Sequence, residues 1–201
     1  MNLGAKQAQE VGGFYCWGHQ QSTASWYRSD YKYFGPGQDT TILKYNTLPR
    51  YGKVDALVKL EECDDAATVA WGNEWCTPTI EQCIELMYQC NWEAGILNGV
   101  RGVYVRSKTN SNWIFFPAGG YGGDAHHGGS ADIMMPGEIV LIMASTLDSR
   151  RPYYGNDMSF SFSQPVYLSK DYSDIMGYGW NPRAGSSNRF GGHNVRPVRK
   201  Y

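Results

Sequence analysis

Residues 71–92 contain the one helix that this sequence specifies clearly, and the helix limits what the remaining chain can form. Thr77 has the side chain of an N-cap, and Pro78 follows at the first helical position, where its missing N–H costs nothing. Residues at three- and four-residue steps then form one apolar stripe, which ends before Asn91. The stripe consists of Ile80, Cys83, Ile84, Met87 and Cys90. We predict that this helix packs against a small, loop-rich β structure and that Trp92 packs just beyond it.

The composition outside the helix favours loops and aromatic packing. The chain has 201 residues, which suits one domain, and it contains 24 glycines and 14% aromatic residues. Its net charge of −1 provides no basic patch for nucleic acid or for an anionic membrane surface. No stretch approaches the roughly 20 apolar residues of a membrane span, and no signal peptide is visible. We therefore expect neither nucleic-acid binding nor direct membrane insertion.

The five cysteines do not form a recognisable framework. Cys83 and Cys90 lie on the helix stripe, where seven residues separate their Cα atoms by roughly 10 Å, too far for a disulfide. The absence of a CxxC pair argues against zinc. Buried free thiols are favoured over a bridge elsewhere, and the redox compartment stays undecided.

Short apolar runs in the second half of the chain predict strands. Residues 99–105 and 113–116 flank a polar turn and predict a β-hairpin. The continuous apolar run 138–144 predicts a buried central strand. Phenylalanine and serine alternate over 158–163, which predicts a strand with one apolar and one polar face.

The two ends of the chain are less regular. Residues 11–17 predict a strand entered through a glycine pair, and residues 191–198 predict a final short strand. Between them, residues 19–51 are aromatic and polar without a clear period, so we expect an irregular excursion. Residues 60–69 predict a short helix, and the acidic pair 64–65 is better placed to cap it than to bind a cation.

One glycine-rich segment, residues 119–129, contains the single cluster with metal-ligand character. Asp124, His126 and His127 are residue types that bind zinc. A solvated loop explains the same composition, and we favour it. The sequence therefore predicts no metal and no cofactor.

Several fragments along the chain occur together, in a fixed order, in one known family. They are Asn2–Ala5, Gly13–Gly18, Asp64–Ala67, Trp71–Gly72, Trp75–Thr79, Cys90–Trp92, Asn98–Gly102, Ile114–Tyr121, Ser145–Thr146 and Val195–Val198.

In this order the fragments resemble the Fibrobacter succinogenes major paralogous domain. The resemblance covers most of the chain and implies an α+β, C-type-lectin-like fold over residues 1–201, with short antiparallel strands, one or two helices and much loop. This chain departs from the family at Cys76, where relatives usually have arginine, and it lacks or replaces the family's first strand.

This chain lacks the residues that two known activities of lectin-like folds require. Calcium-dependent sugar binding needs carboxylate ligands, which the segments 164–166 and 180–182 do not supply. Formylglycine-generating enzymes need reactive cysteines late in the fold, but every cysteine here lies at or before Cys90. No Ser/His/Asp pattern or carboxylate pair stands out either, so we expect no enzymatic activity.

The resemblance also extends to the variable proteins of diversity-generating retroelements, which vary a C-terminal region on a rigid scaffold. Residues 148–190 are rich in Tyr, Ser, Asn, Asp and Gly, a composition typical of antibody paratopes. An ordinary surface of loops has a similar composition, because the same residues form turns. The candidate ligand-binding residues are Arg150, Arg151, Tyr153, Tyr154, Asp157, Tyr172, Tyr178, Trp180, Asn181, Arg183, Arg189 and Phe190.

Two functions follow as hypotheses. The first is a recognition module on a cell surface or phage virion, which binds a cell-surface protein or carbohydrate. The second is a structural or adhesin-tip domain of fixed specificity in a Bacteroidetes surface protein. The sequence does not indicate an oligomeric state.

Overall fold

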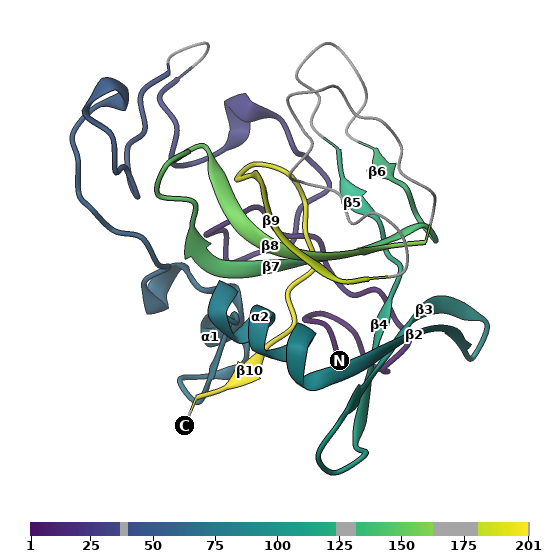
Figure 1. Cartoon of the computed structure of the whole chain (residues 1–201). Coiled ribbons are helices and arrows are strands. Elements are labelled where there is room, and N and C mark those ends of the chain that lie inside the picture. Colours follow the sequence, from purple (N-terminus) through teal and green to yellow (C-terminus); the bar gives the residue numbers. More distant parts are fainter. Residues whose placement is uncertain (37–39, 124–131, 163–180, 201) are drawn as a thin grey trace.

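The computed structural model describes residues 1–36, 40–123, 132–162 and 181–200. They form a mixed α+β fold of mostly antiparallel strands, few helices and much loop (Figure 1). The helices are α1 (Ala66–Trp71) and α2 (Ile80–Gln89), and 3-10 turns cover Arg28–Asp30, Pro49–Tyr51 and Glu62–Asp64. The strands are β1 (Trp75–Cys76), β2 (Cys90–Leu97), β3 (Val100–Ser107), β4 (Trp113–Pro117), β5 (Tyr121–Gly122), β6 (Ile133–Met134), β7 (Ile139–Leu147), β8 (Tyr154–Ser161), β9 (Arg183–Asn188) and β10 (Val198–Arg199).

Helix α2 is present, but it begins two residues later than predicted. Its N-cap is Thr79, whose hydroxyl accepts a hydrogen bond from the Gln82 N–H at 3.3 Å, while the Gln82 side chain accepts one from the Thr79 N–H at 2.9 Å. This reciprocal capping box outweighs the Thr–Pro pair that predicted a start at Thr77. The Thr77 side chain is instead held by Asp65, to which its hydroxyl donates at 2.7 Å.

The helix also ends earlier than predicted, because the chain turns directly into a strand. α2 stops at Gln89, and Cys90 already belongs to β2, which pairs with β3 along its whole length. The prediction that Trp92 packs just beyond the helix is confirmed: its ring stacks on Phe116 at 5.9 Å and on Phe160 at 6.1 Å. These stacked rings join the β2–β3–β4 sheet to the sheet formed by β7, β8 and β9, which carries Phe160.

The predicted hairpin is confirmed as β3 and β4, and the predicted buried strand as β7. Every β7 residue except Thr146 is buried, yet β7 lies at an edge of the β7–β8–β9 sheet rather than at its centre. Single bridges from Lys59 and Asn194 partly cover its outer edge, and α2 packs on the sheet (Figure 1). The strand predicted over 158–163 is confirmed as far as Ser161, the end of β8. Phe160 and Phe162 pack in the apolar core that includes α2, and Ser159 and Ser161 are also buried, because the other side of the sheet is covered as well.

The strands predicted at the two ends of the chain form single bridges instead. Within residues 11–17 only Tyr15 pairs, with His193, and beyond residue 190 the one regular pairing is β10 with β1. Gly12 and Gly18 both have positive φ, a conformation that ends an extended run. The predicted strands are therefore wrong in extent, although the two ends do lie side by side.

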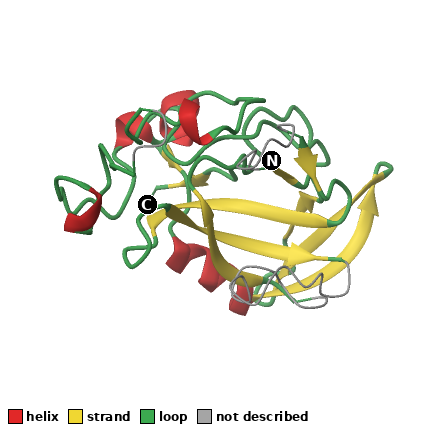
Figure 2. Cartoon of the chain, turned by 90° about the horizontal axis from the view of Figure 1, so that it is seen from above, coloured by secondary structure: helices red, strands yellow, loops and turns green. Residues whose placement is uncertain are grey.

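Two apolar cores lie on opposite sides of the β7–β8–β9 sheet. α2 lies against one side of the strands, and most of the loops lie against the other (Figure 2). The loop-side core is mainly aromatic and includes Trp17, Trp26, Tyr31 and Tyr45. No helix in the described parts of the chain has the length and apolar character needed to cross a membrane.

The short helix predicted over residues 60–69 is found as α1, shifted to Ala66–Trp71; of the acidic pair, Asp65 caps it, whereas Asp64 pairs with Lys32 and Lys44. Asp65 is the N-cap: its carboxylate accepts hydrogen bonds from the Ala67 N–H at 2.9 Å and from the Thr77 N–H at 2.9 Å. Asp65 therefore connects the start of α1 to the segment that leads into α2.

We expect Asp65→Ala to lower the free energy of unfolding by roughly 2–4 kcal/mol, since it removes a cap and leaves buried donors without partners. Urea denaturation measures this change. Glu85→Ala, at an exposed position on α2, is the control and should change the value by less than about 0.5 kcal/mol. Equal values for the two variants would contradict the role assigned to Asp65.

Candidate ligand-binding surface

The turn between β7 and β8 displays the first two candidate arginines on a rigid base. The base is Asp148, which is buried and accepts hydrogen bonds from Arg151 Nε at 2.8 Å, from the Arg150 N–H at 3.1 Å and from Ser186 Oγ at 3.2 Å. Burial raises the pKa of its carboxyl, but the hydrogen bonds, first that from Arg151, outweigh burial and lower it. The Arg150 side chain extends into solvent with 87% of its surface exposed.

The next candidate, Tyr153, belongs to a cluster of tyrosines and arginines. The centre of its ring lies 4.8 Å from the ring centre of Phe34 and 4.8 Å from that of Tyr51, and both contacts are edge to face. The Arg28 guanidinium lies 5.4 Å from the Tyr153 ring, and that of Arg50 lies 4.7 Å from the Tyr51 ring. Tyr153 is therefore half-buried and held in place, with cations beside it.

The same arrangement recurs at Tyr154, whose ring lies 5.1 Å from the Arg151 guanidinium. The Thr47 hydroxyl donates to the Ser149 carbonyl at 2.7 Å and ties the β7–β8 turn to the loop that carries Arg50 and Tyr51. The β7–β8 turn and the segments in contact with it thus carry a group of arginines paired with tyrosine rings. We call it the Arg/Tyr surface: Arg28, Arg50, Tyr51, Arg150, Arg151, Tyr153 and Tyr154.

Sequence reasoning missed three members of this surface, Arg28, Arg50 and Tyr51. All three come from the irregular excursion of residues 19–51, which has no period from which an exposed face could be deduced. The available indication was composition, since arginine and tyrosine recur through that segment.

Two candidate ligand-binding residues are corrected to core residues. Arg189 is 0% exposed, and its guanidinium donates to the Tyr31 hydroxyl at 2.9 Å and to the carbonyls of Pro152 at 2.8 Å, Lys44 at 3.0 Å and Tyr45 at 3.3 Å. The next residue, Phe190, is buried in the aromatic core. Neither side chain can contact a ligand, because the fold has already surrounded both.

Asp157 is also corrected, since it is 1% exposed on the central strand β8. Ser187 Oγ donates to its Oδ2 at 2.5 Å, and its Oδ1 has no hydrogen-bond partner. Burial raises the pKa of this carboxyl to about 7, and the Ser187 hydrogen bond opposes that shift only in part. Asp157 is therefore a protonation site inside the fold rather than a ligand contact.

The remaining described candidates, Asn181 and Arg183, lie away from the Arg/Tyr surface. Arg183 pairs with Ser159 and Asn188 pairs with Tyr154, so Arg183 and Tyr154 are at opposite ends of the β8–β9 pair. Five residues of strand separate these ends by roughly 17 Å. Tyr172, Tyr178 and Trp180 lie outside the described residues, as do Asp124, His126 and His127.

Within the described chain, one group of side chains has metal-ligand spacing: Glu61, Cys63 and Asp64. Its carboxylates are already occupied by cations. Lys44 Nζ lies 2.5 Å from Glu61 and 2.6 Å from Asp64, and Lys32 Nζ lies 3.2 Å from Asp64. A cation would have to displace two lysines, so the group is better described as an ion-pair network.

Comparisons of the chain with protein-family models, with curated proteins and with solved structures find no match.

The buried Asp157 should make stability depend on pH. Its pKa is raised from 3.8 to about 7, so the folded protein holds a proton that the unfolded chain releases between these values. The stabilisation is complete below pH 3.8 and is lost as the pH rises through 7, by at most about 1.4 kcal/mol per pH unit. Asp157→Asn should remove this slope, which chemical denaturation from pH 4 to pH 8 measures.

The difference between wild type and Asp157→Asn isolates this effect. Burial lowers the pKa of His19 and His193 to about 4, so both contribute the opposite slope, but they do so in both proteins. Glu85→Gln, an exposed carboxyl, is the control and should keep the wild-type slope. The same pH dependence in wild type and Asp157→Asn would contradict the assignment.

Proposed function

We propose that this chain is a ligand-recognition module of C-type-lectin-like fold, which binds a cell-surface protein or glycan through the Arg/Tyr surface. The observation that carries the proposal is the pairing of three half-buried tyrosines with arginines, of which Arg50 is exposed and Arg28 and Arg151 are half-buried. The antiparallel strands, two helices and long loops are compatible with that fold.

The residue types of this surface are those that contribute most to binding energy. Arginine and tyrosine are enriched at binding hot spots, and tyrosine offers a large contact area with few rotatable bonds. The Arg151 guanidinium is already oriented by Asp148 and by Ser186 Oγ at 2.9 Å. Less side-chain freedom is therefore lost on binding, which favours affinity.

The charge of the surface indicates what kind of ligand it suits. Four guanidinium groups belong to this surface, and the Asp148 carboxylate that pairs with two of them, Arg150 and Arg151, is buried. Guanidinium binds carboxylate or sulfate oxygens with two parallel hydrogen bonds. We therefore expect acidic groups on the ligand, such as uronic acids of a polysaccharide or acidic side chains of a protein.

A fixed-specificity surface domain is the second candidate, and one observation favours it. The proposed variable span 148–190 includes the core residues Asp157, Phe160, Arg189 and Phe190, which cannot vary freely. Retroelement variation would thus be limited to exposed positions such as Arg150. A genomic template copy that differs from the gene only at adenines of exposed codons would support variation. A copy that differs at the codon for Arg189 would contradict this limit.

An array of acidic and neutral glycans tests the surface itself. Wild-type protein should bind acidic members, and Arg150→Ala combined with Tyr154→Ala should weaken that binding at least tenfold without changing the melting temperature by more than about 2 °C.

Arg106→Ala is the matched control, since it removes an exposed arginine from β3, outside the Arg/Tyr surface. It should bind as wild type does. Equal binding by the double variant would refute the surface. Preference for neutral glycans would refute the expected ligand charge.

A further inference from the structure

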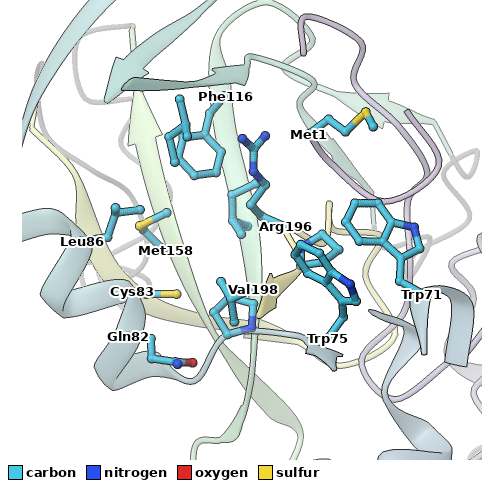
Figure 3. A pocket seen from close by; sticks show the side chains of 14 residues that line it. Met1, Trp71, Trp75, Gln82, Cys83, Leu86, Phe116, Met158, Arg196 and Val198 are labelled. Carbon is cyan, nitrogen blue, oxygen red and sulfur yellow. The ribbon is translucent and has the colours of Figure 1, made fainter. Parts of the chain in front are cut away.

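A concave site lies on the side of the β7–β8–β9 sheet against which α2 packs, and none of its lining residues belongs to the Arg/Tyr surface. Side chains of α2, β4, β7 and β8 and of the C-terminal segment enclose a pocket of about 340 Å³. This size is at the small end of ligand pockets, which span roughly 300–1,000 Å³. Its walls are mostly apolar and include Leu86, Phe116, Met158, Trp71 and Trp75 (Figure 3).

Arg196 brings a guanidinium into this apolar pocket, near the Met1 α-amino group, whose pKa is lowered by burial and by the charge of Arg196. Arg196 extends between Leu86 and Met158 on one side and the two tryptophans on the other, and its guanidinium ends beside Phe116 (Figure 3). Its Cζ lies 5.1 Å from the centre of the Phe116 ring, and Nη1 donates to the Phe115 carbonyl at 3.2 Å. Burial lowers the pKa of this guanidinium to about 10, and no carboxylate of the described residues offsets that effect.

Arg189, which is fully buried, shows how a purely structural guanidinium is held in this fold, whereas Arg196 is half-buried. Arg189 makes four hydrogen bonds to protein oxygens, whereas Arg196 makes one. A guanidinium has five N–H donors, so a single hydrogen bond leaves most donors of Arg196 available to another acceptor. The donors of Arg196 that the protein leaves unused lie in a pocket large enough for a small molecule.

We propose that this pocket binds a small aromatic carboxylate, with its carboxylate on Arg196 and its ring between the apolar walls. A carboxylate supplies the two acceptor oxygens that the fork of the guanidinium matches. The indoles of Trp71 and Trp75 stand edge to face, 5.1 Å apart, and offer an aromatic wall to the ring of the ligand. The pocket is too small for large ligands such as oligosaccharides, so its expected ligand differs in size from that of the Arg/Tyr surface.

Isothermal titration with phenylacetate and indole-3-acetate tests the site, with phenylacetamide as the neutral analogue. Wild type should bind at least one carboxylate with a dissociation constant below about 1 mM, and phenylacetamide at least tenfold more weakly. Binding should also change the tryptophan fluorescence, because Trp71 and Trp75 line the pocket. No binding of either carboxylate, or equal binding of acid and amide, would overturn the proposal.

Two variants keep the test specific. Arg196→Met keeps an apolar stem but removes the charge, so carboxylate affinity should fall at least tenfold while amide affinity stays within threefold of wild type. Leu86→Trp should fill the pocket and abolish binding of both probes with Arg196 still in place. Near-UV circular dichroism and melting temperature establish that each variant is folded.

Arg106→Ala is again the matched control, because it removes an arginine outside the pocket and should bind the carboxylates as wild type does. Unchanged carboxylate affinity in folded Arg196→Met would overturn the role of Arg196. Unchanged affinity in folded Leu86→Trp would place the binding site elsewhere.

Discussion

The loop-rich half of this molecule depends on one buried cation, Arg189. Its guanidinium joins segments that are far apart in sequence, because it donates to Tyr31, to Lys44 and Tyr45, and to Pro152. A buried charge without a carboxylate is expensive, and here carbonyl dipoles and a surrounding cage of aromatic rings offset the cost. The nearest ring, Trp17, lies 4.8 Å from its Cζ. Irregular backbone can stay ordered around the Arg189 guanidinium, because its N–H groups donate to carbonyls that have no partner in a strand.

The candidate ligand surface is built on this centre. Pro152 accepts from Arg189 and directly precedes Tyr153, so the cation beneath fixes the turn whose arginines face outward. Asp148 fixes the other end of the same turn from below. The structure therefore separates two uses of arginine within one span: Arg189 stabilises the scaffold, and Arg150 and Arg151 remain at the surface. The proposed sequence variation can therefore change Arg150 and Arg151 without unfolding the protein, but it cannot change Arg189.

The helix side of the sheet has a different character. There the core is made of apolar side chains from α2 and both larger sheets, and Trp92 stacks between Phe116 and Phe160. Arg196 is the exception, since it extends into this apolar region with one hydrogen bond from its guanidinium. The contrast with Arg189 distinguishes a cation that the fold satisfies from one that it leaves available. The first holds the molecule together, and the second gives the pocket its chemistry.

The sequence by itself determined those features that depend on neighbours in the chain. The apolar stripe specified α2, the alternating run and polar turn specified the β3–β4 hairpin, and the acidic pair specified the cap of α1 at Asp65. Local patterns were less accurate at boundaries, where the Thr79–Gln82 capping box displaced the expected start at Thr77. The mixed α+β class with short antiparallel strands also followed from the sequence.

Only the tertiary structure decided which side chains of residues 148–162 and 181–190 face solvent and which face the core. Arg150 and Arg189 are the same residue type, yet one is exposed and the other buried, because Tyr31, 158 positions away from Arg189, lies where the Arg189 guanidinium can reach. The same holds for the loop of Arg50 and Tyr51, which joins the site through a Thr47–Ser149 hydrogen bond spanning 102 positions. Contacts at such separations leave no periodic pattern in the chain, so they emerge only when the fold brings the segments together.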